Sequence, residues 1–173
     1  MEHMSQYVRF TKTLKDPGIL IKPEEIENYL KDPNIDHYVS INFYSENHLQ
    51  RFKETGTVSK ISDVSTNQLV FDFDSKDNLE LARQDALTLL ERLRSKFGLS
   101  ASNVEIYFSG QKGFTIRTEL SVTLPPNKIA HLALNVFGKG LKTLDTGIYN
   151  ASRIIRVPNT RHQVSGLFKI QLT

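Results

Sequence analysis

Two carboxylates, Asp72 and Asp74, stand at the end of the apolar segment 68–75. The Val and Phe content of this segment and the polar residues that follow it predict a short strand. Successive side chains of a strand point to opposite faces, so the two acids share one face, about 7 Å apart at roughly 3.3 Å per residue. We expect the other face to be buried under a helix, and it carries Leu69, Phe71 and Phe73.

Carboxylates held this close repel each other unless a cation or a proton lies between them. A hard divalent ion such as Mg²⁺ or Mn²⁺ suits the pair, because it takes oxygen ligands and keeps bound water. A half-exposed strand with two solvated acids has the same pattern. The segment alone leaves both interpretations open.

A second cluster is the turn Ser109-Gly110-Gln111-Lys112-Gly113, which joins two alternating segments, 104–108 and 114–120. This pattern predicts a β-hairpin. The glycines let backbone N–H groups approach an anion, and Lys112 adds a positive charge, so the turn is able to hold a phosphate. An ordinary hairpin also uses Gly where φ is positive, and that alternative stays open.

The last third of the chain carries one further acid and a group of basic residues. Asp145 precedes Thr-Gly, where a lone Asp is usually a turn residue. Arginine and lysine side chains in this region are able to clamp a triphosphate. The basic or potentially basic residues are Arg153, Arg156, Arg161, His162 and Lys169.

The elements that position these residues follow from periodicity. An apolar stripe from Leu79 to Phe97 at three- and four-residue steps, closed by Gly98, predicts a long helix. A second helix is expected from 129 to 137, and strands at 153–157 and 167–172. From residue 68 onward the order is strand, helix, strand, strand, helix, then one or two strands, which is the βαββαβ order of a ferredoxin-like or RRM-like unit.

The N-terminal part is expected to be an α/β lobe. It has a helix start at Pro23, with a helix to Leu30, a strand at 37–44, a short helix at 46–52, and loop or weak strand at 56–67. The elements therefore predict one domain, 1–173, with an N-terminal lobe at 1–67 and an RRM-like lobe at 68–173 that carries the clusters described above.

Composition excludes several classes of protein. The 173 residues contain no Cys, which excludes disulfides and Cys-based zinc sites. No apolar run reaches the roughly 18 residues of a membrane span, and no signal-peptide pattern opens the chain, so we expect a cytoplasmic protein with no membrane partner. The net charge of +3 permits a polyanionic partner without requiring one.

Taken in order, the clusters resemble the archaeo-eukaryotic primase superfamily, which includes primase small subunits, primase-polymerases of plasmids and viruses, and polymerase domains of bacterial end-joining ligases. The family's Asp-x-Asp motif is matched by Asp72-Phe73-Asp74. Its Ser-Gly-x-x-Gly-x-His motif is matched by 109–115, its later Asp by Asp145, and its final Arg-Leu-Pro-like run by 156–166. The resemblance covers roughly residues 69–172.

The resemblance implies a primase-polymerase catalytic core that performs template-directed nucleotidyl transfer, as a DNA primase, a DNA polymerase or both. Asp72, Asp74 and Asp145 would be catalytic and would bind two Mg²⁺ or Mn²⁺ ions about 3.5–4 Å apart. The implied partners are a single-stranded DNA template, a primer and an NTP or dNTP. The residues implied to grip the triphosphate are Ser109, Gly110, Lys112, Thr115, Arg156 and His162.

The resemblance also implies an archaeal, bacterial, plasmid or viral replication context. Many relatives carry a further helical or helicase domain, so this chain is consistent with a domain excised from a longer protein, or with one that works beside a partner subunit. One departure matters: the family's second-motif His falls at Thr115, which donates a hydrogen bond but carries no charge. Lys112, Arg117 or Arg156 would supply the missing charge, or activity would be reduced.

Two alternatives remain. A catalytically weakened primase-like or RRM-like module would bind single-stranded nucleic acid without turnover, although RRMs stack bases on exposed strand aromatics. A haloacid-dehalogenase-type phosphatase also begins with Asp-x-Asp at a strand end, and its first Asp is a nucleophile. That class needs a late acidic pair, and the C-terminal third of this chain is basic instead.

Overall fold

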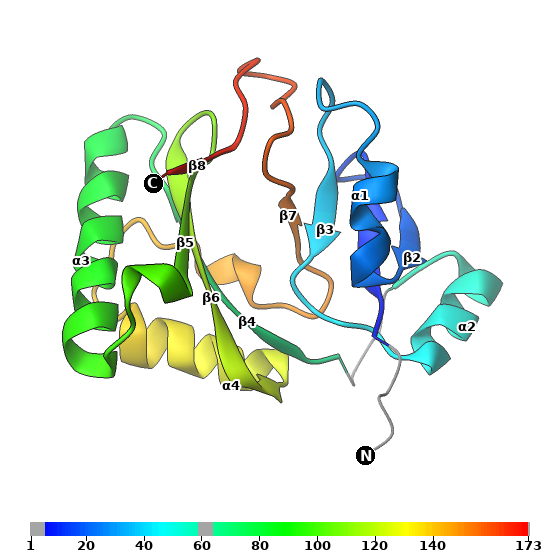
Figure 1. Cartoon of the computed structure of the whole chain (residues 1–173), viewed down its shortest axis with the longest axis horizontal. Helices are drawn as coiled ribbons and strands as arrows, with labels where there is room; N and C mark the ends of the chain where they lie inside the picture. The colour runs from blue at the N-terminus through cyan, green and yellow to red at the C-terminus, as the bar shows by residue number, and fades with distance from the viewer. Residues whose placement is uncertain (1–5, 59–63, 173) are drawn as a thin grey trace.

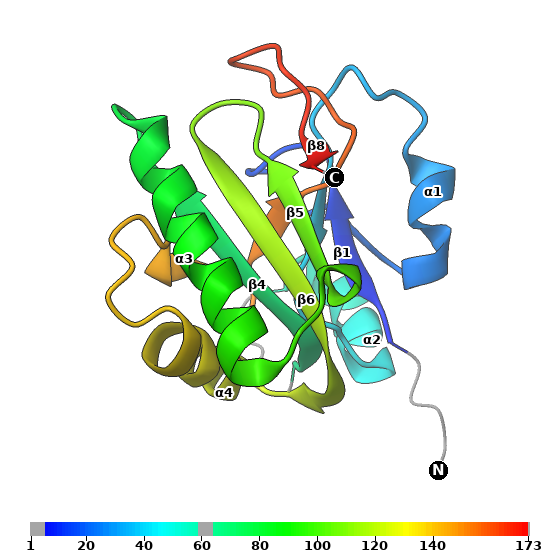
Figure 2. The same ribbon diagram turned by 60° about the vertical axis from the view of Figure 1, so that its left-hand side comes forward.

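The computed structural model describes residues 6–58 and 64–172, and these form a mixed α+β fold built on two antiparallel sheets (Figure 1). The first sheet has the strand order β2-β1-β3-β7, and the second has the order β4-β6-β5-β8. Helices α3 and α4 cover the outer side of the second sheet, while α1 and α2 lie with the first (Figures 1 and 2). The mixed α+β class predicted from the sequence is confirmed.

The two sheets are built from eight short to medium strands within the described residues. They are β1 (Val8–Thr11), β2 (Ile19–Ile21), β3 (Tyr38–Ser40), β4 (Thr66–Asp74), β5 (Val104–Phe108), β6 (Gly113–Leu124), β7 (Ile154–Arg156) and β8 (Ile170–Leu172). The α-helices are α1 (Ile26–Tyr29), α2 (Glu46–Thr55), α3 (Leu79–Phe97) and α4 (Pro126–His131). The other helical segments are the 3-10 helices η1 (Pro23–Glu25), η2 (Ala101–Asn103) and η4 (Thr146–Ile148) and the π-helix η3 (Leu132–Phe137).

The core of the second sheet lies between β4 and α3. Leu69, Phe71 and Phe73 on β4 are fully buried, as the alternation predicts. Burying one such side chain contributes about 1.5–3 kcal/mol. Helix α3 begins at Asn78, whose side chain accepts a hydrogen bond from Glu80 N, and ends at a left-handed Gly98. The predicted long helix is therefore confirmed, and its apolar stripe is buried at Ala82, Ala86, Leu89 and Leu93, while the two ends of the stripe, Leu79 and Phe97, are exposed.

The β5–β6 hairpin is also confirmed. Its residues pair from Val104 with Thr118 to Phe108 with Phe114, and the turn Ser109–Lys112 joins them. Strand β6 is longer than predicted and runs to Leu124. Its first part pairs with β4 in the register that places Thr115 opposite Asp72. The two acids of β4 therefore lie beside the hairpin turn.

The closing strands are distributed between the two sheets. Strand β7 pairs with β3 in the first sheet, and β8 pairs with the outer side of β5. On the other edge of β4, the described residues form an isolated bridge, Phe73 to Leu144. Chain from both predicted lobes thus builds the first sheet, and the division at residues 67 and 68 stays a prediction.

The expected N-terminal elements occur in the expected order, preceded by the unpredicted strands β1 and β2, and the helix expected at 46–52 extends as α2 to Thr55. The helix expected at 23–30 is η1 followed by α1, and the strand expected at 37–44 is reduced to β3. Part of the predicted loop 56–67, residues 59–63, lies outside the described residues. Among the described helices, none is both long and apolar enough to cross a membrane.

Candidate active site

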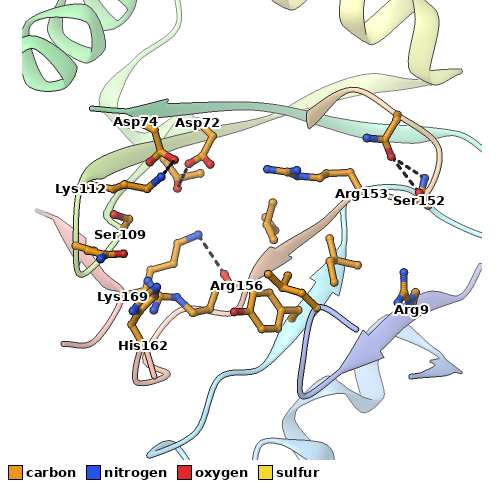
Figure 3. Close-up of a pocket in the computed structure, with 17 residues that line it drawn as sticks. Arg9, Asp72, Asp74, Ser109, Lys112, Ser152, Arg153, Arg156, His162 and Lys169 are labelled. Atoms are coloured by element: carbon orange, nitrogen blue, oxygen red, sulfur yellow. Dashed lines mark hydrogen bonds and ion pairs between the residues drawn. The ribbon is translucent and has the colours of Figure 1, made fainter. Parts of the chain in front are cut away.

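A cleft of about 480 Å³ lies between the two sheets, and Figure 3 shows the side chains that line it. Seven of the nine site residues predicted from the sequence line this cleft, and they are Asp72, Asp74, Ser109, Lys112, Thr115, Arg156 and His162. The other two, Gly110 and Asp145, lie next to it. Further basic side chains in the lining are Arg9, Arg153 and Lys169. The cleft therefore combines two carboxylates with many cations.

Asp72 and Asp74 point into the cleft from the end of β4, as strand alternation requires. Thr115 Oγ1 donates a hydrogen bond of 2.9 Å to Asp72 Oδ1. Lys112 Nζ lies 2.9 Å from Asp74 Oδ2. Each carboxylate is thus held by a group from β6 or from the turn before it.

The close approach of β6 to β4 depends on Gly113. A Cβ built on this residue would lie 1.8 Å from Phe73 O and 2.7 Å from Asp74 Oδ1. No side chain fits there without moving backbone. Gly113 thus lets the turn come close enough for Lys112 to reach Asp74.

The pKa of the Asp72 carboxyl is raised, chiefly because burial disfavours its charge. The neighbouring charge of Asp74 acts in the same direction. Lys169, the Thr115 hydroxyl and Arg153 oppose the rise. Asp72 is therefore a carboxyl that gains from any additional cation placed in the cleft.

The turn Ser109–Gly113 is fixed by its own hydrogen bonds and by the C-terminal loop. Ser109 N donates to Gly113 O at 2.9 Å, and Gly113 N donates to Ser109 Oγ at 3.1 Å. Gly110 has φ +81°, and a Cβ there would lie 2.8 Å from Phe168 O. Ser165 Oγ donates to Gly110 O at 2.8 Å. Gly110 therefore shapes the turn from behind while Ser109 and Lys112 face the cleft.

Lys169 is the most buried cation of the cleft, with 4% of its surface exposed. Its ammonium donates to Arg156 O at 3.1 Å and lies 5.3 Å from the centroid of the Tyr107 ring. Burial lowers the pKa of Lys169 to about 8, although the charge of Asp72 acts against this shift. Lys169 is a cation inside the cleft that loses its charge under mildly alkaline conditions.

Arg156 and His162 border the same part of the cleft as Lys169 (Figure 3). Arg156 is buried and its Nη1 lies 3.5 Å from Asp36 Oδ1. Asp36 Oδ2 also accepts a hydrogen bond of 3.2 Å from Gln163 N. The pKa of His162 is lowered, first by burial and then by the charge of Arg156. Asp36 thus ties together the guanidinium and the loop that carries the imidazole.

The backbone of Asp145 is hydrogen-bonded to that of Asp72, but the carboxylate of Asp145 has other partners. Asp145 N donates to Asp72 O at 2.8 Å. Its Oδ1 accepts from Gly147 N at 2.8 Å, and its Oδ2 from Arg153 Nη2 at 3.0 Å. Among residues 6–58 and 64–172, no three His, Cys, Asp or Glu side chains are grouped so that they could hold a metal ion. The predicted three-carboxylate set is not assembled in this structure.

The remaining two carboxylates fit a hard divalent ion by their chemistry. Asp72 and Asp74 present oxygen ligands from adjacent outward positions of one strand, and desolvation makes the Asp72 charge costly without a cation. Lys112 and Lys169 supply positive charge in its place. The oxygen donors thus suit such an ion, while the ion pair with Lys112 already neutralises Asp74.

Several residues of the cleft were not included in the predicted site. Arg153 and Lys169 were noted only as part of a basic group, and Arg161 of that group lies outside the cleft, where its Nε donates to Gly166 O. Arg9 and Tyr38 were not part of the predicted site, since both come from the N-terminal part and reach the cleft only through the fold. Asp36, from the same part, does not line the cleft but pairs with Arg156, which does.

The comparisons with known proteins are sparse. No protein-family model matches the chain, and no curated protein matches its sequence. Among solved structures, the chain is similar to the polymerase domain of ligase D from Mycobacterium tuberculosis, determined in complex with DNA. The TM-score is 0.52 at 13% identity, over 80% of this chain and 52% of the other. The chain therefore spans about half the length of that domain and shares its fold.

Proposed function

We propose that the chain is the catalytic core of a primase-polymerase of the archaeo-eukaryotic type, a nucleotidyltransferase that acts on single-stranded DNA, a primer and an NTP or dNTP. One observation supports this most directly: Asp72 and Asp74 face a cleft bordered by a glycine-containing turn and several cations. The fold shared with the ligase D polymerase domain is consistent with the proposal. That this chain also binds DNA is part of the proposal.

In this proposal the triphosphate lies along the basic side of the cleft. Lys112, Arg156 and His162 would bind its oxygens through charge-assisted hydrogen bonds, and Ser109 and Thr115 through their hydroxyls. Arg153 is a further ligand, because its Nε is buried with no hydrogen-bond partner among the described residues. Together these groups would hold the α-phosphorus opposite the attacking hydroxyl.

Asp72 and Asp74 would hold Mg²⁺ or Mn²⁺. When bound, such ions lower the pKa of the attacking hydroxyl and stabilise the leaving pyrophosphate. Asp145 would join them on leaving Arg153, which would then be free to bind phosphate. The reaction forms a bond from the primer 3′-oxygen to the α-phosphorus and breaks the bond to the β-phosphate. The hydroxyl proton goes to water.

A second candidate is a related module that binds single-stranded nucleic acid without turnover. It is favoured by the ion pairs of Asp74 with Lys112 and of Asp145 with Arg153, which neutralise two of the three acids without a metal. Thr115 in place of the family's His fits the same interpretation. The two candidates share a fold and differ in turnover.

The deciding experiment is nucleotide incorporation on a single-stranded template, with and without a labelled primer, in Mg²⁺ or Mn²⁺ and with both nucleotide types. Asp72→Asn is the inactive variant, and Asp77→Asn, an exposed acid three residues beyond Asp74, is its matched control. Metal-dependent product with wild type and Asp77→Asn, but not with Asp72→Asn, supports the enzyme. Binding of the strand without product supports the second candidate, while phosphate release from a small phosphoester would instead favour a phosphatase.

A further inference from the structure

A second pocket, of about 490 Å³, lies on the first sheet. Arg9 and Phe10 are neighbours on β1, so they point to opposite faces. Arg9 lines the cleft and Phe10 lines this second pocket, and no described residue lines both. The second pocket is therefore separate from the candidate active site. The volume of the second pocket is within the range of small-molecule sites.

The interior of this pocket is aromatic and aliphatic. The Phe10 ring lies 5.7 Å from the Tyr29 ring and 5.5 Å from the His37 ring, measured between centroids. Phe10 and His37 are buried, but Tyr29 remains 40% exposed and Ile19, on β2, remains 39% exposed. A tyrosine ring and an isoleucine thus offer apolar surface, from two different elements, to a flat ring that enters the pocket.

The rim carries both kinds of charge. Lys12 and Lys31 are exposed, and neither forms an ion pair or side-chain hydrogen bond within the described part of the chain. Asp16 and Asp32 each use one carboxylate oxygen to accept a backbone N–H, from Gly18 at 2.8 Å and Asn34 at 2.9 Å. The lysines are therefore available to an anionic group, and each acid keeps a second oxygen for a donor.

We propose that this pocket binds one nucleotide unit, with the base against Tyr29 and Ile19 and the phosphate at Lys12 and Lys31. Base–aromatic stacking contributes about 1–3 kcal/mol per base in single-strand binding proteins. The exocyclic amino group of a base is a donor that suits the free oxygens of Asp16 and Asp32. A free nucleotide and one residue of a single strand share this chemistry.

The pocket is connected to the cleft by the loop 12–17. Arg9 Nε donates to Pro17 O at 2.8 Å, and Arg9 Nη2 donates to Asp16 O at 2.7 Å. The same loop places Leu14 in the cleft and Lys12 in the second pocket. A nucleotide held at Lys12 and Asp16 therefore contacts a loop that also borders the candidate active site.

The test is a titration of the isotope-labelled protein, without divalent metal, with dAMP and separately with a short oligodeoxyadenylate, followed by NMR. Signals of Ile19 and Ile35 report on this pocket, and those of Ser109 to Gly113 report on the cleft. We expect Ile19 and Ile35 to shift. A response to dAMP indicates a free nucleotide, and a response to the oligonucleotide alone indicates a strand residue; both support the proposal.

Two variants make the test specific. Lys12→Ala/Lys31→Ala removes the phosphate contacts and is expected to weaken binding at Ile19 about tenfold, since two exposed contacts together contribute about 1.4 kcal/mol. Ile19→Trp fills the pocket and is expected to abolish the response of Ile35, the reporter that this variant keeps. Lys53→Ala/Lys96→Ala removes the same charge from exposed helical positions and should change nothing at this pocket.

Shifts confined to Ser109–Gly113, or no shift at Ile19 and Ile35 with either probe, would overturn the proposal. So would equal binding by wild type and Lys12→Ala/Lys31→Ala. Because the measurement requires no turnover, it is independent of whether nucleotide incorporation succeeds. A protein without polymerase activity but with a nucleotide at Tyr29 would leave this inference standing.

Discussion

Thr115 Oγ1 donates a hydrogen bond of 2.9 Å to Asp72 Oδ1 across the β4–β6 ladder. Thr115 occupies the position of the His in the family motif that the chain resembles. In this chain the hydroxyl contacts a carboxylate at the strand end, and the nearby positive charge comes from Lys112 and Lys169. The hydroxyl of Thr115 therefore helps to hold Asp72 in position.

We expect Thr115→Val to reduce nucleotide incorporation about 10- to 100-fold, because a net hydrogen bond to a charged group contributes about 1.5–3 kcal/mol. The hydroxyl lowers the pKa of Asp72, so its loss raises that pKa further. The acid limb of the pH–rate profile should then move to higher pH. Thr115→Ser, which keeps the hydroxyl, should retain both rate and profile; an unchanged profile in Thr115→Val would contradict the assigned role.

Asp72→Asn should separate stability from activity. Burial raises the pKa of Asp72, so the folded state holds its proton more tightly than the unfolded chain does. The contribution of this carboxyl to stability is thus greatest at acid pH and is lost as pH rises through the folded pKa. At pH 7 a neutral amide avoids this cost.

We therefore expect Asp72→Asn to unfold at a temperature at least equal to that of wild type at pH 7. Its incorporation rate should fall at least ~100-fold, more than the loss of a supporting ligand usually costs. Calorimetry and primer extension on one preparation measure the two effects. A marked fall in melting temperature would mean that attraction to the charge of Lys169 outweighs desolvation.

The lowered pKa of Lys169 predicts that anion binding weakens at alkaline pH, as an alkaline limb of the binding profile. Its pKa is lowered to about 8, so it is charged below that pH and neutral above it. Triphosphate affinity should weaken as pH rises through about 8, and in Lys169→Met it should already be weak at pH 7 and lack this limb. Nucleotide titration at several pH values measures both. Lys96→Met, on the exposed end of α3, is the control that should keep the limb.

The effect of Lys169 on folding stability should have the opposite pH dependence to its effect on triphosphate affinity. Between about pH 8 and the ordinary lysine pKa, the unfolded chain binds more protons than the folded one, so this group makes stability rise with pH. Lys169→Met removes that rise. Denaturant titrations across this pH interval would show it.

Much of the candidate site follows from local patterns. Alternation in β4 places Asp72 and Asp74 on the cleft face and their apolar neighbours in the core. The hairpin follows from two alternating segments around a glycine-containing turn. These features depend on residues close in sequence, and strand or helix periodicity is enough to predict them.

Other features depend on long-range contacts, which a single sequence does not encode locally. Strand β7 pairs with β3 about 115 residues earlier in the chain, a partner that no local pattern selects. Asp145 has the expected neighbour, Asp72, but its carboxylate caps η4 and binds Arg153, as Asp before Thr-Gly often does in a turn. Burial of Lys169 arises from the packing of the C-terminal segment on β5.

Gly113→Ala is expected to be strongly destabilising, by roughly 3 kcal/mol or more, because its Cβ would overlap Phe73 O in the adjacent strand. The ladder would have to open, and Lys112 would move away from Asp74. Gly98→Ala is the matched control: its φ of +66° is unfavourable for Ala, but no atom lies within 4 Å of the new Cβ. We expect it to cost only about 1 kcal/mol. Equal losses in the two variants, measured by urea denaturation, would argue against close packing at Gly113.

The last prediction concerns Asp36, which binds Arg156 and the Gln163 amide from a position 120 residues before the arginine. Both members of the pair are buried, so Asp36→Asn leaves a buried guanidinium without its counter-charge, at a cost of about 3–5 kcal/mol. The exposed pair Glu80–Arg83 on α3 is the matched control, and Glu80→Gln should cost less than about 1 kcal/mol. If Asp36 positions Arg156 for the triphosphate, Asp36→Asn should also raise the KM for nucleotide about tenfold with little change in kcat at a temperature where the variant is folded. A lower melting temperature with an unchanged KM would mean that Asp36 serves only the fold, and that Arg156 keeps its place in the cleft without it.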